Sequence, residues 1–503
     1  MAGMPSAPLA RRPSTPLAWA RRLRRPLVSA AVLLGAVALL APTVEASAVA
    51  HPVAVAAVST AAPVPGDPTS GDSLFPDVGN RGYDVQHYDI ALAYARGRTG
   101  AAAASITATT TITAVADHPL SSIPLDLEGL TVDRVTVDGR PAPTSRTGHK
   151  LIVTPRSAVR GTFTVVVYYH GSPVPHIDPD GAQDGWIPTA DGATVLGEPV
   201  GAMTWFPGNN TPRDKATFRV QVTVPKDLEV AGNGDLGPRT TRDGRTTWTW
   251  TMASPMATYL AMISIGHYDV YTSSMSSIDG RTIPLWTFVD SKLGSRDQSR
   301  AAVPEAIRFD ESEFGPYPFS SAGIVIDVTG VGFALETQSR PTFDRTADLS
   351  TVVHEFAHQW FGDSVALEDW GDIWLNEGFA TWAEWRYAAA HGGSTTAQAS
   401  RRVYDAHPAS SSFWTPGPNA LTNPADLFSN RVYLRGAMTL EALRQRVGTA
   451  QLVRMLRTWA ATRAGQSVNT AEFIARAEQV SGVRLDSLFD RWLTTSGRPP
   501  LPS

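Results

Sequence analysis

The sequence predicts a multidomain protein of mixed α and β structure, in which an antiparallel, sandwich-like β domain precedes an α-rich domain. The chain has 503 residues, which at roughly 100–200 residues per domain allows two or three domains. Apolar and polar residues mostly alternate from residue 83 to about 270, as in half-buried strands. From about residue 271 the apolar residues recur with helical spacing. We therefore expect domains at 75–270 and 271–503.

The first 48 residues have the order of a secretory signal peptide. Six arginines lie between Arg11 and Arg25, an apolar run covers 27–40, and Ala46-Ser47-Ala48 offers a small-residue cleavage site. The apolar run is shorter than the roughly 20 residues that span a bilayer, and an uncleaved anchor is the alternative. Residues 49–74 are expected to form a flexible linker. We expect a secreted protein with no membrane span after cleavage.

Strands of the first domain are indicated by alternation, and its turns by Asp-Gly pairs. Such pairs favour the tight turns of β-hairpins and occur at Asp138-Gly139, Asp191-Gly192 and Asp243-Gly244. The clearest alternating stretches are 88–94, 132–137, 163–169 and 218–224. These features predict an antiparallel sheet domain.

One strand and six helices are expected in the second domain. The stretch 282–290 is strand-like. Helical spacing predicts segments at 301–314, 348–362, 373–390, 435–447, 451–462 and 470–481. Gly362 and the pair Gly392-Gly393 are expected to end helices.

Composition excludes several classes of protein. Lys and Arg total 43 against 47 Asp and Glu, a net charge of −4, and a nucleic-acid-binding protein would instead carry a basic excess. Cysteine is absent, which excludes disulfides, a cysteine zinc site and a thiol nucleophile. Arginine supplies 39 of the 43 basic residues. Together with abundant Ala, Gly and Pro, this is typical of a GC-rich bacterial genome.

The motif His354-Glu355-Phe356-Ala357-His358 carries the chemistry. Residues four apart on a helix share one face, so the two imidazoles can bind one Zn²⁺ at about 2.0–2.1 Å. Glu355 would then lie beside the metal, where it can accept a proton from water. A coincidental histidine pair is disfavoured because the segment has a helical pattern and a third ligand follows.

That third ligand is Glu377, which eighteen residues separate from His358. The interval lets one helix end, a loop turn and a second helix return, so that a carboxylate near its start completes a His₂Glu zinc site with an open position. An ordinary helix-start glutamate is the alternative. Four acidic residues are candidates for hydrogen bonds to the zinc histidines, and spacing does not choose among them. They are Asp363, Glu368, Asp369 and Asp372.

This spacing is the gluzincin pattern, and the chain resembles the aminopeptidase N family of zinc metallopeptidases, in a short, secreted bacterial form similar to those of actinobacteria. Four other stretches resemble family segments. These are 332–338, similar to Gly-x-Met-Glu-Asn; 433–437, similar to Tyr-x-x-Gly-Ala; Leu196-Gly197-Glu198 with Phe206-Pro207 in the β domain; and Arg491-Trp492 with 497–500 near the end. Leu335 and Thr337 stand where the family has Met and Asn.

The resemblance implies a thermolysin-like catalytic domain with one Zn²⁺ per chain. His354, His358 and Glu377 would be its ligands, with Glu355 as general base. Tyr433 would stabilise the oxyanion of the tetrahedral intermediate.

The substrate class follows from two further carboxylates. Glu336 and Glu198 would hold the free α-ammonium group of peptide substrates, so the expected activity is that of an aminopeptidase, with no nucleic-acid partner. A zinc endopeptidase with the same ligands is an alternative, and a non-catalytic binding protein of the same fold is another.

Overall fold

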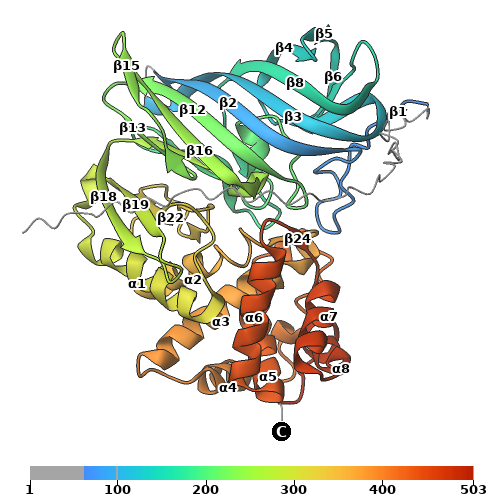
Figure 1. Cartoon of the computed structure of the whole chain (residues 1–503), viewed down its shortest axis with the longest axis vertical. Helices are drawn as coiled ribbons and strands as arrows, with labels where there is room; N and C mark the ends of the chain where they lie inside the picture. Colours follow the sequence, from blue (N-terminus) through green and yellow to red (C-terminus); the bar gives the residue numbers. More distant parts are fainter. Residues whose placement is uncertain (1–61, 98–99, 502–503) are drawn as a thin grey trace, which may run out of the picture. The chain divides into compact units, whose positions relative to one another are not determined.

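The computed structural model describes residues 62–97 and 100–501. The predicted signal peptide, 1–48, lies outside the described residues. The described residues belong to one compact unit of the chain. Within this unit a β-rich half precedes an α-rich half, which confirms the predicted order (Figure 1).

The alternating segments of the sequence form a 12-stranded sheet in which long strands lie side by side (Figure 1). Inward residues such as Ile90, Val165 and Val222 are fully buried, while their neighbours along each strand are more exposed. Along the sheet the strands follow the order β14 (Asp235–Leu236), β16 (Arg245–Ala257), β12 (Lys215–Pro225), β2 (Tyr83–Gly97), β3 (Gly100–Asp126), β8 (Val159–Gly171), β4 (Thr131–Val137) and β5 (Arg140–Ala142). Four short strands pair beside this path: β1 (Val64–Pro65), β6 (Thr144–Thr147), β7 (Lys150–Val153) and β15 (Thr240–Arg242).

Most pairs in this sheet are antiparallel, as expected, but β12 runs parallel to β2. The reason lies in the connection. The chain leaves β2 through β3 and returns to the other edge of β2 only after it has built part of a second sheet, so β12 enters in the same direction. Strand β1 also pairs parallel, with β3.

A second sheet shares its hydrophobic core with the first. It carries the predicted turn Asp191-Gly192 between two paired strands. Asp138-Gly139 and Asp243-Gly244 also join paired strands, with all four residues at positive φ, which is the geometry of a type I′ hairpin turn. The strands of the second sheet are β13 (Glu229–Gly232), β17 (Ile263–Gly266), β11 (Ala193–Leu196), β10 (Gln183–Pro188) and β9 (Pro175–Ile177).

A third sheet opens the α-rich half, and its strand 282–290 has the predicted bounds. Its strands are β18 (Tyr268–Ser276), β19 (Thr282–Asp290), β20 (Ala322–Asp327), β22 (Thr342–Asp344) and β21 (Ala334–Leu335). A small pair, β23 (Ala366–Leu367) and β24 (Ser467–Val468), joins two segments that are distant in sequence.

Eight α-helices form in the described residues, and all six predicted segments are helical in most or part of their length. They are α1 (Asp297–Phe314), α2 (Leu349–Ala357), α3 (Trp374–Ala390), α4 (Thr396–Ala406), α5 (Gly436–Val447), α6 (Thr449–Arg463), α7 (Thr470–Ser481) and α8 (Asp486–Phe489). The prediction missed α4, although Thr395 and Gln398 form a capping box at its start. Helix α2 is shorter than predicted because the chain turns sharply from His358 to Gly362.

Packing extends further toward the N-terminus than the boundary predicted at residue 75. The described part of the expected linker, 62–74, includes β1 and the buried Leu74. Asp72 accepts N–H bonds from Leu74, Phe75 and Trp370, which fixes this segment to the α-rich half. A buried carboxylate with three donors explains why these residues are ordered despite their loop-like composition.

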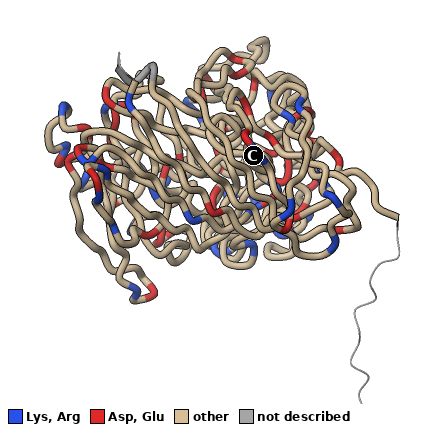
Figure 2. Tube along the Cα trace, turned by 90° about the horizontal axis from the view of Figure 1, so that it is seen from above, with Lys and Arg blue, Asp and Glu red and all other residues tan. Residues whose placement is uncertain are grey.

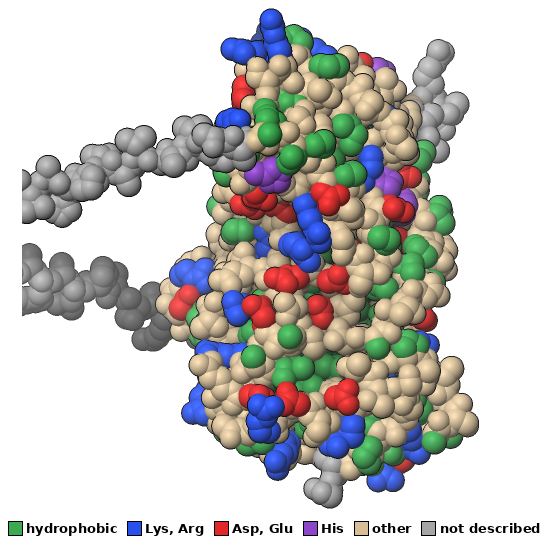
Figure 3. Space-filling view, turned by 90° about the vertical axis from the view of Figure 1, so that its right-hand side faces the viewer, with side chains coloured by type: hydrophobic (Ala, Val, Ile, Leu, Met, Phe, Trp, Pro, Cys, Tyr) green, Lys and Arg blue, Asp and Glu red, His purple; other side chains and the backbone are tan. Residues whose placement is uncertain are grey.

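Charged side chains of both signs are interspersed along the trace (Figure 2) and over the face drawn in Figure 3. This distribution agrees with the small net charge. Within residues 62–97 and 100–501, no helix is both long and apolar enough to cross a membrane.

Candidate active site

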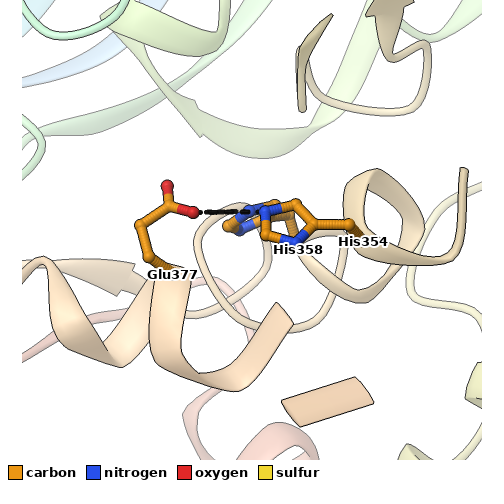
Figure 4. A group of neighbouring side chains, drawn as sticks. All are labelled: His354, His358 and Glu377. Atoms are coloured by element: carbon orange, nitrogen blue, oxygen red, sulfur yellow. Dashed lines mark hydrogen bonds and ion pairs between the residues drawn. The ribbon is translucent and has the colours of Figure 1, made fainter. Parts of the chain in front are cut away.

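The two histidines of the motif converge with Glu377, as the sequence predicts. His354 lies in the last turn of α2 and His358 caps its C-terminal end, while Glu377 lies in the first turn of α3. Oε2 of Glu377 is 3.2 Å from Nε2 of His354 and 3.4 Å from Nε2 of His358. Figure 4 shows the carboxylate pointing toward both rings.

The other ring nitrogens are engaged elsewhere, which fixes how each imidazole faces. Nδ1 of His354 donates to Oε1 of Glu384 at 2.8 Å, and Nδ1 of His358 donates to the carbonyl of Phe361 at 3.1 Å. With a proton on each Nδ1, both Nε2 atoms present lone pairs to the carboxylate.

This arrangement fits a divalent cation. The two Nε2 atoms and Oε2 of Glu377 each direct a lone pair toward the same point. When both imidazoles are neutral, no hydrogen atom lies between these three donors to form a hydrogen bond. All three lie within 4.8 Å of one another, and His358 and Glu377 are buried. Two imidazoles and one carboxylate are a donor set that suits zinc, with room for a fourth ligand.

The turn after α2 brings α3 close to the histidines. Gly362 has a φ of +130°, and a Cβ there would lie 3.3 Å from both Cγ of Asn376 and Nδ1 of His358. Glycine therefore allows the chain to reverse within contact of α3. The hydroxyl of Tyr259, from the β-rich half, donates to the carbonyl of Gly362 at 3.1 Å and anchors this turn.

Glu355 points into the same cavity as the histidines. Burial raises the pKa of its carboxyl to about 8, and the neighbouring His354 and His358 act in the opposite direction. A divalent cation at the three ligands would lower that pKa further, so an ionised base is expected in the loaded protein.

Tyr433 enters from a third element, the π-helix Arg431–Arg435 that precedes α5. Its ring stacks near His354, with centroids 6.1 Å apart and planes 22° apart. Burial, followed by the nearby carboxylates, raises the pKa of its phenol well above the usual value. The phenol therefore stays protonated and keeps an O–H donor beside the candidate metal ligands.

Glu336 and Glu198 complete the predicted group, although they come from different halves of the chain. An oxygen of each lies within 4.8 Å of the other and of a Glu377 oxygen. Both residues are buried, and Oε1 of each has no hydrogen-bond partner among the described residues. Burial, and then the charge of Glu336, raises the pKa of Glu198. Such carboxyls are ready to receive a cationic group.

All seven predicted site residues line one cavity of about 420 Å³. Seven of its sixteen lining residues are Asp or Glu, and none is Lys or Arg. Five other lining residues stand in no motif that the sequence patterns identified: Asp178, Asp180, Phe333, Glu384 and Phe428. Glu384 could have been found, because it lies seven residues after Glu377 and so shares a face of α3.

The four acidic residues proposed to bond the histidines do not do so. The Nδ1 partners are Glu384 and the carbonyl of Phe361 instead. Glu368 accepts from Asn469, Asp369 from Ser73, and Asp372 from Thr470, which places them at other contacts. Asp363 is buried near Glu336, not at an imidazole nitrogen.

The segment with Leu335 and Thr337 in place of Met and Asn keeps Glu336 in the cavity wall. Ala334 and Leu335 form strand β21, which pairs with β22 and delivers Glu336 at its end. The Thr337 hydroxyl turns away and donates to the carbonyl of Arg340 at 2.6 Å. Gly332, at a φ of +82°, donates its N–H to Asp344 and starts this loop.

Comparison with known proteins finds two matching family models. The peptidase family M1 domain matches residues 324–492, and the peptidase M1 N-terminal domain matches residues 183–260. Aminopeptidase M1 of Arabidopsis thaliana is 26% identical over 60% of this chain and 36% of its own length. Glutamyl aminopeptidase of Bos taurus is 26% identical over 60% of this chain and 34% of its own length. The chain thus spans little more than a third of these curated relatives.

Similarity to solved structures extends over both halves. An M1 zinc metallopeptidase from Deinococcus radiodurans is 32% identical, with a TM-score of 0.79, over 86% of this chain and 99% of that one. A mutant of that metallopeptidase with a bound Tyr-Ser-Ala substrate matches at 31% identity, with the same TM-score and the same coverage of both chains.

Proposed function

This chain belongs to the peptidase M1 family, and we propose that it is a secreted, zinc-dependent aminopeptidase with one zinc ion per chain. Secretion is supported by the order of basic, apolar and small residues in 1–48, and bacterial, actinobacterial-like origin by the arginine-rich composition. Zinc is supported by the His354, His358 and Glu377 donor set and by the names of the similar metallopeptidases.

One observation carries the aminopeptidase assignment. Glu336 and Glu198 present buried carboxyl oxygens without partners to the cavity that holds the candidate metal ligands, and its lining contains no Lys or Arg. A peptide's free α-ammonium group would pair with them and place its first peptide bond at the metal. An acylated amino terminus would leave both carboxylates buried and unpaired, which is costly.

Glu355 and Tyr433 would each have a distinct role in peptide hydrolysis. When bound, zinc supplies a Lewis acid that polarises the peptide carbonyl and lowers the pKa of water. Glu355 accepts the proton of the attacking water as its oxygen bonds to the carbonyl carbon. The Tyr433 hydroxyl donates a hydrogen bond to the resulting oxyanion. Glu355 then delivers the proton to the leaving amine as the C–N bond breaks, which restores the carboxylate.

The test compares an aminoacyl anilide with its N-acetylated twin on zinc-loaded protein. We expect the free amine to be cleaved at least about 10³-fold faster, since an unpaired buried polar group typically costs that much or more in specificity. Glu336→Ala should raise KM for the free amine and reduce the discrimination. Glu368→Ala, a carboxylate outside the cavity, is the matched control and should change neither.

Other outcomes point to the alternatives. Equal cleavage of both anilides would contradict the exopeptidase claim and favour a zinc endopeptidase. If the protein neither cleaves these anilides nor binds zinc, a non-catalytic protein of the same fold would be favoured.

A further inference from the structure

A second group of potential metal ligands lies on a β-hairpin of the cavity wall. His176 on β9 faces Asp184 on β10 across the hairpin, and Asp178 lies two residues after His176 on the same face. One donor atom from each residue lies within 4.8 Å of the others. Small movements of the three side chains would bring their donor atoms to about 2.0–2.2 Å from a shared metal ion, the usual coordination distance.

Both carboxyl groups, of Asp178 and Asp184, are buried, and each has an oxygen without a hydrogen-bond partner in the described part of the chain. Asp178 is 8% exposed and Asp184 is 1% exposed, and Oδ1 of each has no partner among the described residues. Burial raises the pKa of Asp178 to about 7, and His176 is the group that counteracts it. Two buried carboxyl groups this close together, each with one oxygen that accepts no hydrogen bond from a described residue, need either protons or a cation.

The histidine is oriented as a metal ligand. Its Nδ1 lies 2.8 Å from Oε2 of Glu128, to which it donates. The hydrogen bond to Glu128, together with the charges of Asp184 and Asp178, raises the pKa of His176, so a metal ion would displace a proton from Nε2. In the neutral ring Nε2 is the nitrogen with a free lone pair, which is the arrangement found where a carboxylate supports a metal-bound imidazole. Glu128 comes from the loop between β3 and β4, so the partner is built by a separate segment.

We propose that His176, Asp178 and Asp184 bind a second divalent transition-metal ion, distinct from the one at His354, His358 and Glu377. Imidazole nitrogen with two carboxylates suits Zn²⁺ or Mn²⁺ and disfavours Ca²⁺, which takes oxygen ligands. The proposal does not rest on the proposed activity, because it uses none of the catalytic residues.

The site would stabilise the wall of the catalytic cavity. The hairpin turn places Asp178, Asp180 and Ala182 in the cavity lining. Oδ2 of Asp184 accepts the N–H of Val200 at 3.2 Å, two residues after Glu198. A cation bound to the hairpin would therefore connect two segments of this wall.

Metal counting tests the proposal. After equilibrium dialysis against micromolar Zn²⁺, we expect two equivalents per chain in the wild type and one in Asp184→Asn or Asp178→Asn. His358→Ala should also hold one, and the double variant His358→Ala/Asp184→Asn none. Asp180→Asn, on the same turn but outside the group, is the matched control and should hold two.

A thermal measurement covers variants that fold poorly. In His358→Ala, which keeps only the second site, Tm should rise with Mn²⁺ or Zn²⁺ concentration but not with Ca²⁺. One equivalent in the wild type, unchanged by Asp184→Asn, together with a Tm of His358→Ala that ignores Mn²⁺ and Zn²⁺, would overturn the proposal. The carboxyls would then be held by protons alone.

Discussion

Gly378 on α3 and Gly436 on α5 meet backbone to backbone. A Cβ placed on Gly378 would lie 2.8 Å from the Cα of Gly436, closer than real Cβ contacts. Gly378 follows the proposed metal ligand Glu377, and Gly436 lies three residues after Tyr433. The close approach of two glycines therefore brings the tyrosine to the proposed metal ligands, and gives a physical role to the glycine of the Tyr-x-x-Gly-Ala segment.

Replacing Gly436 with alanine should force the two helices apart. We expect Gly436→Ala to lower the free energy of unfolding by about 1–3 kcal/mol, a typical cost of overpacking, and to reduce turnover because Tyr433 moves. Arg446→Ala, on the exposed face of α5, should change neither quantity. Denaturant unfolding and steady-state kinetics measure both, and a Gly436→Ala variant with wild-type values would refute this role of the glycine contact.

Tyr433→Phe isolates the hydroxyl from the ring. We expect kcat to fall about 10²–10³-fold, as for the loss of one oxyanion donor, while zinc content and KM stay near those of the wild type. Tyr404→Phe, whose hydroxyl donates to Pro499 away from the cavity, is the control. A Tyr433→Phe enzyme with an unchanged kcat would show that the oxyanion is stabilised elsewhere.

Glu384→Gln tests the hydrogen bond that orients His354. The amide weakens the acceptor for Nδ1–H, so zinc affinity should fall about 10–100-fold, the usual effect of losing such a partner. Competition with a chelator measures the affinity. Glu368→Gln, at a carboxylate that accepts from Asn469 outside the cavity, should bind zinc as the wild type does. Equal affinity in the two variants would contradict the orienting role of Glu384.

We expect Asp214 to make the stability of the β-rich half depend on pH. Its carboxylate accepts from the Val85 N–H and the Asn209 amide, and burial raises its pKa from 3.8 to about 8. Because the folded state holds this proton more tightly, the stabilisation is complete below the unfolded pKa and is lost as pH rises toward about 8. Unfolding free energies measured at pH values across this window should fall less steeply for Asp214→Asn than for the wild type; equal slopes would count against this assignment.

Much of the fold could be predicted because burial imposes a clear period. The strand at 282–290 and the Asp-Gly turns matched the structure, since alternation and positive φ leave direct marks in sequence. The predicted helix at 348–362 was too long, because Trp360 and Phe361 are buried in an irregular turn whose apolar spacing imitates a helix. The parallel pairing of β12 with β2 depends on the path of a long connection, which no local pattern records.

The candidate site also contains some residues that local spacing could identify and others that only the tertiary structure brings together. The candidate metal ligands could be identified from sequence because His354 and His358 are four residues apart and Glu377 follows His358 after eighteen intervening residues. Asp178 reaches the cavity on a hairpin whose residues lie far from the motif in sequence, so only the tertiary structure brings it there. Glu384 lies between these cases, since its spacing from Glu377 was visible but its contact with His354 was not.

The most direct test of the zinc peptidase assignment is zinc content measured beside turnover in Glu377→Ala and Glu355→Gln. Glu377→Ala should lose the catalytic zinc and its activity together, because one of three ligands is gone. Glu355→Gln should keep that zinc while kcat falls about 10²–10⁴-fold, the range of general acid–base catalysis. Full zinc content and turnover in Glu377→Ala, or near-wild-type turnover in Glu355→Gln, would contradict the assignment.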